Sequence, residues 1–126
     1  MDQEIASDPG VAAGLKKARL AGAQKHLFLC LGPECAPLKK GEKVWDYLKQ
    51  RSAELEKEGV VQVMRTKAQC LRVCARGPWL VVYPDGVWYG EVTVERCERI
   101  LAEHVVGGRP VEEWVAARNP LAPPCG

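Results

Sequence analysis

Apolar side chains along this chain form short runs and helical stripes that divide it into a few predicted elements. The run HLFLC at 26–30 is apolar and is followed by a Gly-Pro pair, which predicts a buried strand. Residues 41–58 carry apolar side chains at helical spacing among charged ones, and Gly59 is a typical helix stop. The alternating, β-branched stretch VVQVMRT at 60–66 predicts a second strand. Together these segments predict a strand–helix–strand unit.

The second half of the chain contains its clearest local signal, the segment WLVVYPDGVWYGEV at 79–92. Two strand-like runs flank Pro-Asp-Gly in this segment, which predicts a β-hairpin. Residues 94–106 have apolar side chains at spacings of three and four, so we expect an amphipathic helix there. A short terminal helix is expected from Pro110 to Arg118.

This order of elements predicts an α/β fold with the thioredoxin-like arrangement, in which a central mixed sheet of about four strands is flanked by helices. A single domain is expected over 25–118. Residues 1–24 form an N-terminal tail, expected to be disordered over 1–10 and to hold a possible helix over 11–23. The Pro-rich residues 119–126 form a second tail.

Composition and charge narrow the class of protein. The chain has 126 residues, of which 47% are hydrophobic and 27% charged, which is typical of one globular domain. No apolar run approaches the ~18 residues of a membrane helix. The polar, acidic start MDQEIASDPG is unlike a signal peptide, so we expect a cytoplasmic protein that is not bound to a membrane. The formal net charge of +2 argues against a nucleic-acid partner.

Four of the six cysteines form two short pairs, Cys30 with Cys35 and Cys70 with Cys74. Each pair follows a predicted strand, and neighbouring parallel strands end at the same edge of a sheet, so we expect the four sulfurs to converge. Four thiolates from two loops can hold a [2Fe–2S] cluster or one Zn²⁺, or they can form two disulfides. In the cytoplasm, metal ligands and redox centres are more common than structural disulfides. The spacing alone leaves these alternatives open.

Basic residues gather in the half of the chain that carries the paired cysteines. Residues 25–80 contain eleven Lys and Arg against six Asp and Glu, whereas residues 81–126 contain four against seven. A solvated face is the ordinary explanation of such a run. A docking patch for an acidic protein partner is the other explanation. The candidates for that patch are Lys39, Lys40, Arg72 and Arg76.

With these residues in view, the chain resembles the thioredoxin-like [2Fe–2S] ferredoxins of the Shethna type, which are related to the [2Fe–2S] subunit of NADH dehydrogenase (complex I). The matching stretches, which cover most of 26–114, are HLFLCLGPEC, QCLRVCARGP, LVVYPDGVWYGEVT and HVVGGRPVEEW. The resemblance implies a one-electron carrier, not an enzyme, that passes electrons between a protein donor and a protein acceptor. It also implies a possible homodimer.

The resemblance assigns roles to particular residues as well. It implies that Cys30 and Cys35 bind one iron of the cluster and that Cys70 and Cys74 bind the other. It further implies a cis peptide bond before Pro78.

Other classes of protein remain open beside this one. The same fold could carry a thiol–disulfide redox protein or an interaction module stapled by Zn²⁺. The chain could also be a subunit of a larger dehydrogenase. No catalytic base or nucleophile is legible in the sequence, so we predict no catalytic residues. Cys97 lies on the apolar face of the last predicted helix and is expected in the core, and Cys125 is expected to be an incidental thiol.

Overall fold

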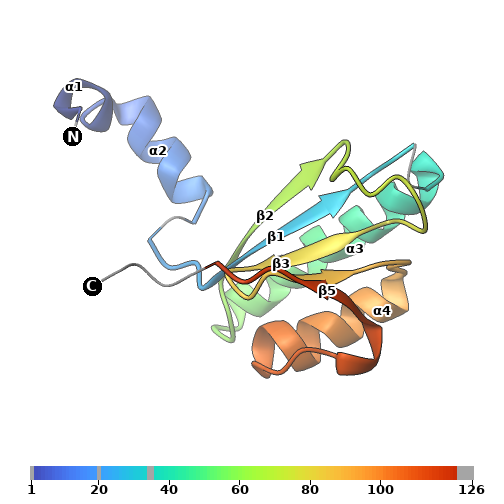
Figure 1. Ribbon diagram of the computed structural model, residues 1–126. Helices are drawn as coiled ribbons and strands as arrows, with labels where there is room; N and C mark the ends of the chain where they lie inside the picture. The colour runs from blue at the N-terminus through green and yellow to red at the C-terminus, as the bar shows by residue number, and fades with distance from the viewer. Residues whose placement is uncertain (1, 20, 34–35, 122–126) are drawn as a thin grey trace.

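The computed structural model describes residues 2–19, 21–33 and 36–121. Its centre is a five-stranded sheet in the order β2-β1-β3-β4-β5 (Figure 1). The strands are β1 (Lys25–Cys30), β2 (Val63–Ala68), β3 (Leu80–Tyr83), β4 (Val87–Tyr89) and β5 (Val115–Arg118). The fold is therefore α/β with a mixed sheet, as the order of predicted elements indicated, and has one strand more than the expected four.

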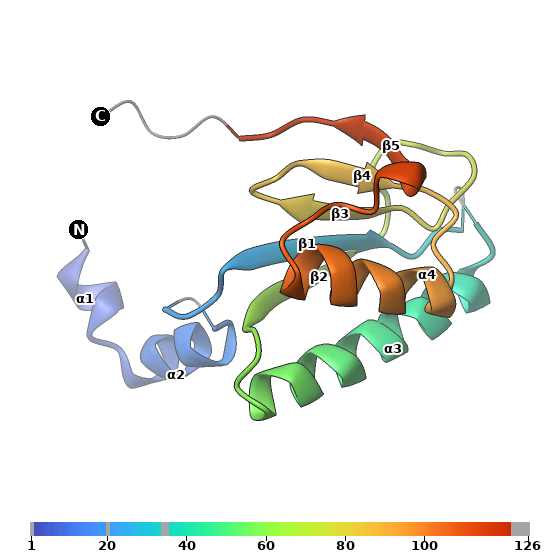
Figure 2. The same ribbon diagram turned by 90° about the horizontal axis from the view of Figure 1, so that it is seen from below.

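Two long helical segments pack on one face of this sheet (Figure 2). They are α3 (Leu38–Lys57) and α4 (Val94–Arg99), and α4 continues as the π-helical segment η1 (Ile100–Val106). Both were predicted, the second as one helix over 94–106. No helix in the described part of the chain is long and apolar enough to cross a membrane.

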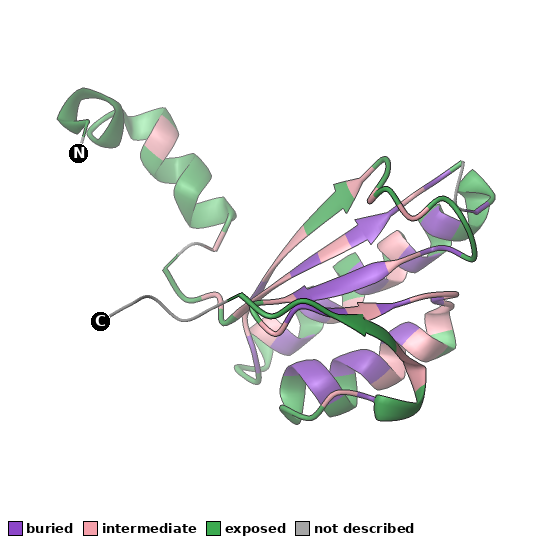
Figure 3. Cartoon of the chain, in the orientation of Figure 1, coloured by how far each residue is buried: buried purple, intermediate pink, exposed green. Residues whose placement is uncertain are grey.

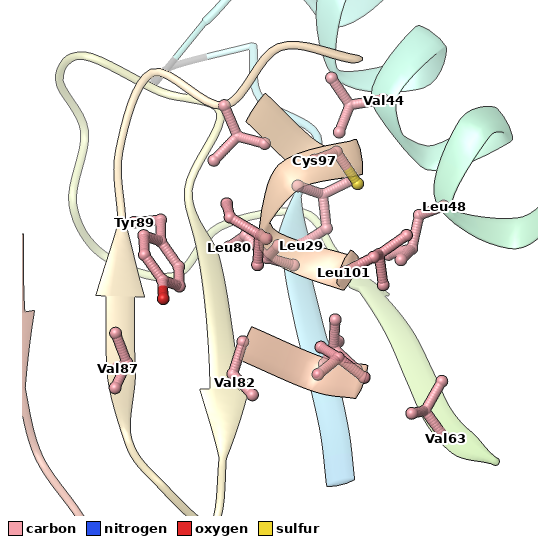
Figure 4. Close-up of a cluster of buried hydrophobic side chains, with 14 of the residues drawn as sticks. Leu29, Val44, Leu48, Val63, Leu80, Val82, Val87, Tyr89, Cys97 and Leu101 are labelled. Carbon is pink, nitrogen blue, oxygen red and sulfur yellow. The ribbon is translucent and has the colours of Figure 1, made fainter. Parts of the chain in front are cut away.

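The hydrophobic core lies between the sheet and these helices (Figure 4). Leu27 and Leu29 of β1 point into it, because alternate side chains of a strand face the same side of the sheet. Leu48 of α3 and Leu101 of η1 meet them from the helical layer. Cys97 lies in the same cluster and is fully buried, which confirms its predicted place in the core.

The register of the sheet decides which loops share an edge. Strands β1 and β2 are parallel, and Cys30 lies opposite Ala68, the last residue of β2. Strand β3 runs antiparallel to β1, with Leu80 opposite Leu29, so β3 begins at the edge where β1 ends. The prediction that both cysteine loops leave the sheet at one edge is confirmed.

Helix α3 begins next to the first of these loops. Gly41 in its first turn lies against the backbone of Leu31, and a Cβ atom at Gly41 would lie only 2.6 Å from the carbonyl oxygen of Leu31. A larger residue at Gly41 would push the helix away from the chain that follows Cys30. This glycine therefore fixes how the helix approaches the cysteine edge.

The predicted terminal helix from Pro110 to Arg118 is wrong. A short 3₁₀ turn, η2 (Glu112–Trp114), leads instead into β5, which pairs antiparallel with β4. Val115 packs against the core, so pairing with an existing strand outweighs the helical propensity of the two alanines that follow it.

Helix α1 (Gln3–Ala6) lies in the stretch 1–10 that was expected to be disordered, whereas α2 (Pro9–Lys17) overlaps the helix expected over 11–23. Asp8 caps α2, because its side chain accepts hydrogen bonds from the backbone N–H groups of Gly10 at 2.7 Å and Val11 at 3.2 Å. Neither helix contains a buried residue, and both stand away from the sheet (Figures 1 and 3).

Candidate metal centre

The first cysteine of the predicted site, Cys30, is the last residue of β1 and has no exposed surface. Its backbone N–H donates a hydrogen bond to the carbonyl oxygen of Trp79 at 3.0 Å. The backbone N–H of Trp79 in turn donates to the Cys30 sulfur, Sγ, at 3.0 Å. The sulfur is thus held at the sheet edge by the residue that precedes β3.

The second pair lies in the loop between β2 and β3, where Cys70 and Cys74 are exposed. Their sulfur atoms are 4.0 Å apart. Two thiolates on one tetrahedral metal are separated by roughly 3.8 Å when each metal–sulfur bond is about 2.3 Å. The Cys70–Cys74 pair therefore already has the spacing that two ligands of one metal require.

A backbone N–H group also points at the sulfur of Cys70. Arg72 donates this hydrogen bond at 3.1 Å, and its φ of 72° turns the backbone back toward the cysteine. Arg76 further along the loop also has a positive φ, 55°. Such conformations are costly for residues other than glycine, so other contacts must hold the loop in this shape.

The two loops begin side by side at the edge of the sheet. The backbone N–H of Leu31 donates to the carbonyl oxygen of Ala68 at 2.9 Å, which joins the residues just after Cys30 and just before the second loop. Cys35 lies outside the described residues. Among the residues described, no group of three or more His, Cys, Asp or Glu is close enough to hold a metal ion. The described geometry thus shows one preformed pair of sulfurs and a third sulfur at the same edge.

The donor atoms at this edge fit a thiolate-bound metal group. Sulfur ligands select soft metals such as zinc, copper(I) and the iron of iron–sulfur clusters. Backbone N–H groups aimed at the sulfurs of Cys30 and Cys70 stabilise the negative charge of thiolates, as is usual around such ligands.

Two hydrogen bonds between Arg76 and Glu91, here called the Arg76–Glu91 clasp, join the cysteine loop to the connection between β4 and α4. The Arg76 side chain donates to the Glu91 carboxylate at 2.7 Å, and the backbone N–H of Glu91 donates to the carbonyl oxygen of Arg76 at 2.8 Å. The hydrogen bond from Arg76 lowers the pKa of Glu91, and the nearby charges of Arg96 and Lys40 act in the same direction.

The four candidate docking residues are all exposed, but they differ in whether their charge is paired with an acidic side chain. Lys39 and Lys40 are exposed in the first turn of α3, and Arg72 is exposed on the cysteine loop. The side chain of Arg76 is 77% exposed, yet part of its charge is engaged by Glu91. The charges of Arg76 and Lys40 both lower the pKa of Glu91.

Two residues that shape this edge were not predicted as part of the site, Trp79 and Glu91. Trp79 directly follows the Gly-Pro pair that ends the cysteine loop, and Glu91 follows Gly90, the residue after β4. No sequence motif identifies these two residues as part of the site. Only their places next to glycine-containing turns could have drawn attention to them. The peptide bond before Pro78 is cis, as the resemblance implied.

Comparison with known proteins supplies the family. No family model matches the chain. It is 31% identical over 101 residues to a 2Fe-2S ferredoxin of Aquifex aeolicus (strain VF5), a match that covers 75% of this chain and 91% of the relative. A putative 2Fe-2S ferredoxin of Priestia megaterium is 35% identical over 94 residues, covering 75% of this chain and 71% of the relative.

A solved structure agrees with these relatives. The structure of a thioredoxin-like [2Fe-2S] ferredoxin from Aquifex aeolicus matches the fold with a TM-score of 0.67 at 31% identity, covering 81% of this chain and 96% of that one. The sequence and structural matches agree with the sulfur-lined edge described above. This chain therefore belongs to the thioredoxin-like [2Fe–2S] ferredoxins.

Proposed function

We propose that Cys30, Cys35, Cys70 and Cys74 hold the [2Fe–2S] cluster of this ferredoxin, which carries single electrons between protein partners. The observation that carries the proposal is the parallel pairing of β1 and β2. It places Cys30 opposite Ala68, two residues before Cys70. The 4.0 Å separation of the Cys70 and Cys74 sulfurs, which suits two ligands of one metal, also supports the proposal.

When bound, the cluster supplies exchange of one electron between its oxidised and reduced states. The chain contributes the sulfur ligands and the backbone N–H groups of Arg72 and Trp79. These hydrogen bonds favour the more negative, reduced state because they stabilise charge on sulfur. The exposure of Cys70 and Cys74 supports a carrier role, since a partner can approach this side directly.

We also propose that the partner presents an acidic face to this edge. Lys39, Lys40, Arg72 and Arg76 are all exposed, and no Asp or Glu occurs between Gly59 and Leu80. Opposite charges steer two proteins toward one another and fix their orientation. The cytoplasmic setting and the homodimer stay predictions, to be tested by cell fractionation and by light scattering of the purified protein.

The proposed ligands are tested by purifying the protein without oxygen and recording its visible spectrum before and after dithionite. We expect a red-brown protein that bleaches on reduction and contains about two irons and two acid-labile sulfides per chain. Cys70→Ser and Cys74→Ser should lose or destabilise this chromophore, because each removes a thiolate ligand.

Cys97→Ser is the matched control, since Cys97 is fully buried in the core and burial raises the pKa of its thiol to about 12. The visible spectrum and iron content of Cys97→Ser should match those of the unmodified protein. Colourless protein with about one zinc, or with no metal and oxidised thiols, would contradict the proposal and support the structural or disulfide alternative.

A further inference from the structure

Trp79 is the residue whose backbone holds Cys30 from both sides. Its carbonyl oxygen accepts the hydrogen bond from the Cys30 N–H, and its own N–H donates to the Cys30 sulfur, each at 3.0 Å. Any displacement of Trp79 therefore moves a hydrogen-bond donor away from this sulfur. A larger separation would weaken the hydrogen bond because its strength falls with distance.

The side chain of the same residue reaches the other cysteine pair. The indole N–H of Trp79 donates to the carbonyl oxygen of Ala75 at 2.8 Å. Ala75 directly follows Cys74 in the exposed loop, where the backbone is held in an unfavourable conformation at Arg72 and Arg76. The indole bond thus supports the loop beside the second pair of sulfurs.

Close packing against neighbouring residues fixes the indole in this position. The ring lies over Gly90, where an added Cβ atom would lie only 3.0 Å from the nearest ring carbon. The rings of Trp79 and Trp88 meet edge to face at a centroid distance of 6.5 Å. Trp79 also packs against the small apolar cluster formed by Cys30 and Ala36.

We propose that Trp79 is a positioning residue that sets the geometry of Cys30 and of the Cys70–Cys74 loop toward the cluster. The inference rests on the proposed ligand set. The Arg76–Glu91 clasp differs from it, because that clasp joins the cysteine loop to the connection between β4 and α4. Trp79 joins Cys30 to the loop that carries Cys70 and Cys74, through its own peptide groups and one rigid side chain.

The test compares Trp79→Phe with Trp88→Phe in cluster-loaded protein. Trp79→Phe keeps an aromatic ring but removes the N–H that holds Ala75. Release of iron to a chelator should become about tenfold faster, as is typical when a group that orients a metal ligand is lost. The reduction potential should move to a more negative value, because the hydrogen bond to the Cys30 sulfur loosens.

Trp88→Phe is the control, since it makes the same chemical change in the neighbouring ring. Within the described residues, the structure records no hydrogen bond from the Trp88 indole. It also keeps an aromatic ring against Trp79, so its potential and iron release should change less than those of Trp79→Phe. An unchanged potential and release rate in Trp79→Phe, or equal changes in both variants, would overturn the inference.

A second variant separates positioning from general loss of stability. Gly90→Ala leaves Trp79 intact but forces its ring to shift, because the new methyl group meets ring carbons at 3.0 Å. It should move the potential in the same direction as Trp79→Phe. A shift in the opposite direction, or none, would overturn the inference. The unmodified protein could bind a normal cluster while these variants match it in reduction potential and iron release. That outcome would refute only the role of Trp79, and the proposed ligands would stand.

Discussion

Two groups of side chains with unusual surroundings lie at opposite ends of β1. Cys30 ends the strand at the sulfur-lined edge, and Lys25 begins it beside a buried polar network. At the centre of that network is His104, which is fully buried. Its ring nitrogens lie 2.8 Å from the Tyr89 hydroxyl and 2.6 Å from the Asp85 carboxylate. The cysteine edge and the buried network around His104 are therefore separated by the length of β1.

This network is complete when His104 is neutral. The backbone N–H of Val111 donates to the Tyr89 hydroxyl at 3.0 Å, the hydroxyl can donate to Nδ1 of His104, and Nε2 can donate to Asp85. A proton added at Nδ1 would leave the Tyr89 hydroxyl hydrogen without its acceptor. Burial accordingly lowers the pKa of His104, although Asp85 opposes this effect. The charges of Lys25 and Arg118 lower it further.

Acid should therefore destabilise the protein through His104. As the pH falls below the ordinary value of 6.5, the unfolded chain binds a proton at this histidine that the folded chain does not. Stability is then lost with falling pH until the folded-state pKa is reached. An NMR titration of the ring should show a midpoint below 6.5. A midpoint at or above that value would contradict the neutral network.

The variant His104→Gln checks the same link. We expect it to be less stable than the unmodified protein at pH 7.5 by about 1–3 kcal/mol, because it disrupts a buried hydrogen-bond network. It should also lose less stability between pH 7.5 and 5.5 in denaturant unfolding. His26, whose pKa burial also lowers, is present in both proteins and so cancels in the comparison. Asp85 adds a further loss only below its ordinary pKa of 3.8, because hydrogen bonds from Lys25 and His104 outweigh its burial and lower its pKa.

At the scale of elements, the sequence was most informative where local pattern and tertiary structure agree. The run 26–30, the helix ending before Gly59 and the hairpin around Asp85 were all predicted, because each has its own periodicity and turn residues. β5 was missed because its Val-Ala-Ala-Arg stretch becomes a strand only by pairing with β4. The cysteine edge was predicted from the strand order, but the positive φ of Arg72 and the place of Trp79 depend on contacts between distant segments.

Helices α1 and α2 should be dispensable for the stability of the domain. They contain no buried residues, and isolated helices this short are marginal in water. Deleting residues 1–17 keeps the ion pair between Arg19 and Glu56. We expect the free energy of unfolding to change by no more than about 0.5 kcal/mol and the visible spectrum to be unchanged. A clear drop in stability would show that these helices cover part of the folded protein.

For the whole molecule, charge is unevenly distributed between the two halves of the chain. The basic excess lies in residues 25–80, which include the cysteine loops, and the acidic excess lies in 81–126. Arg72 is the better residue for testing whether the basic charge at the cysteine edge attracts a partner. Replacing Arg76 would also break its hydrogen bond to Glu91 and disturb the loop. Lys57, in the last turn of α3, is an exposed cation far along the helix from the cysteine edge.

Arg72→Glu should slow electron transfer from the reduced protein to an acidic flavodoxin used as a probe, most strongly at low ionic strength. Lys57→Glu makes the same change of charge and should have a smaller effect. Transfer to a basic cytochrome c should not be slowed by Arg72→Glu. Stopped-flow rates at several salt concentrations give the comparison. Equal effects of the two substitutions on the flavodoxin rate, or rates independent of salt, would count against docking at the cysteine edge.

The crossover that joins β1 to β2 has a consequence for how the protein is made. Parallel neighbours cannot be linked by a tight turn, so the two cysteine pairs are brought together only after α3 has formed and packed. A chain still emerging from the ribosome presents each pair separately, as a two-sulfur chelate. The proposed four-sulfur site is thus a product of the completed tertiary structure, so binding of iron and sulfide is coupled to folding.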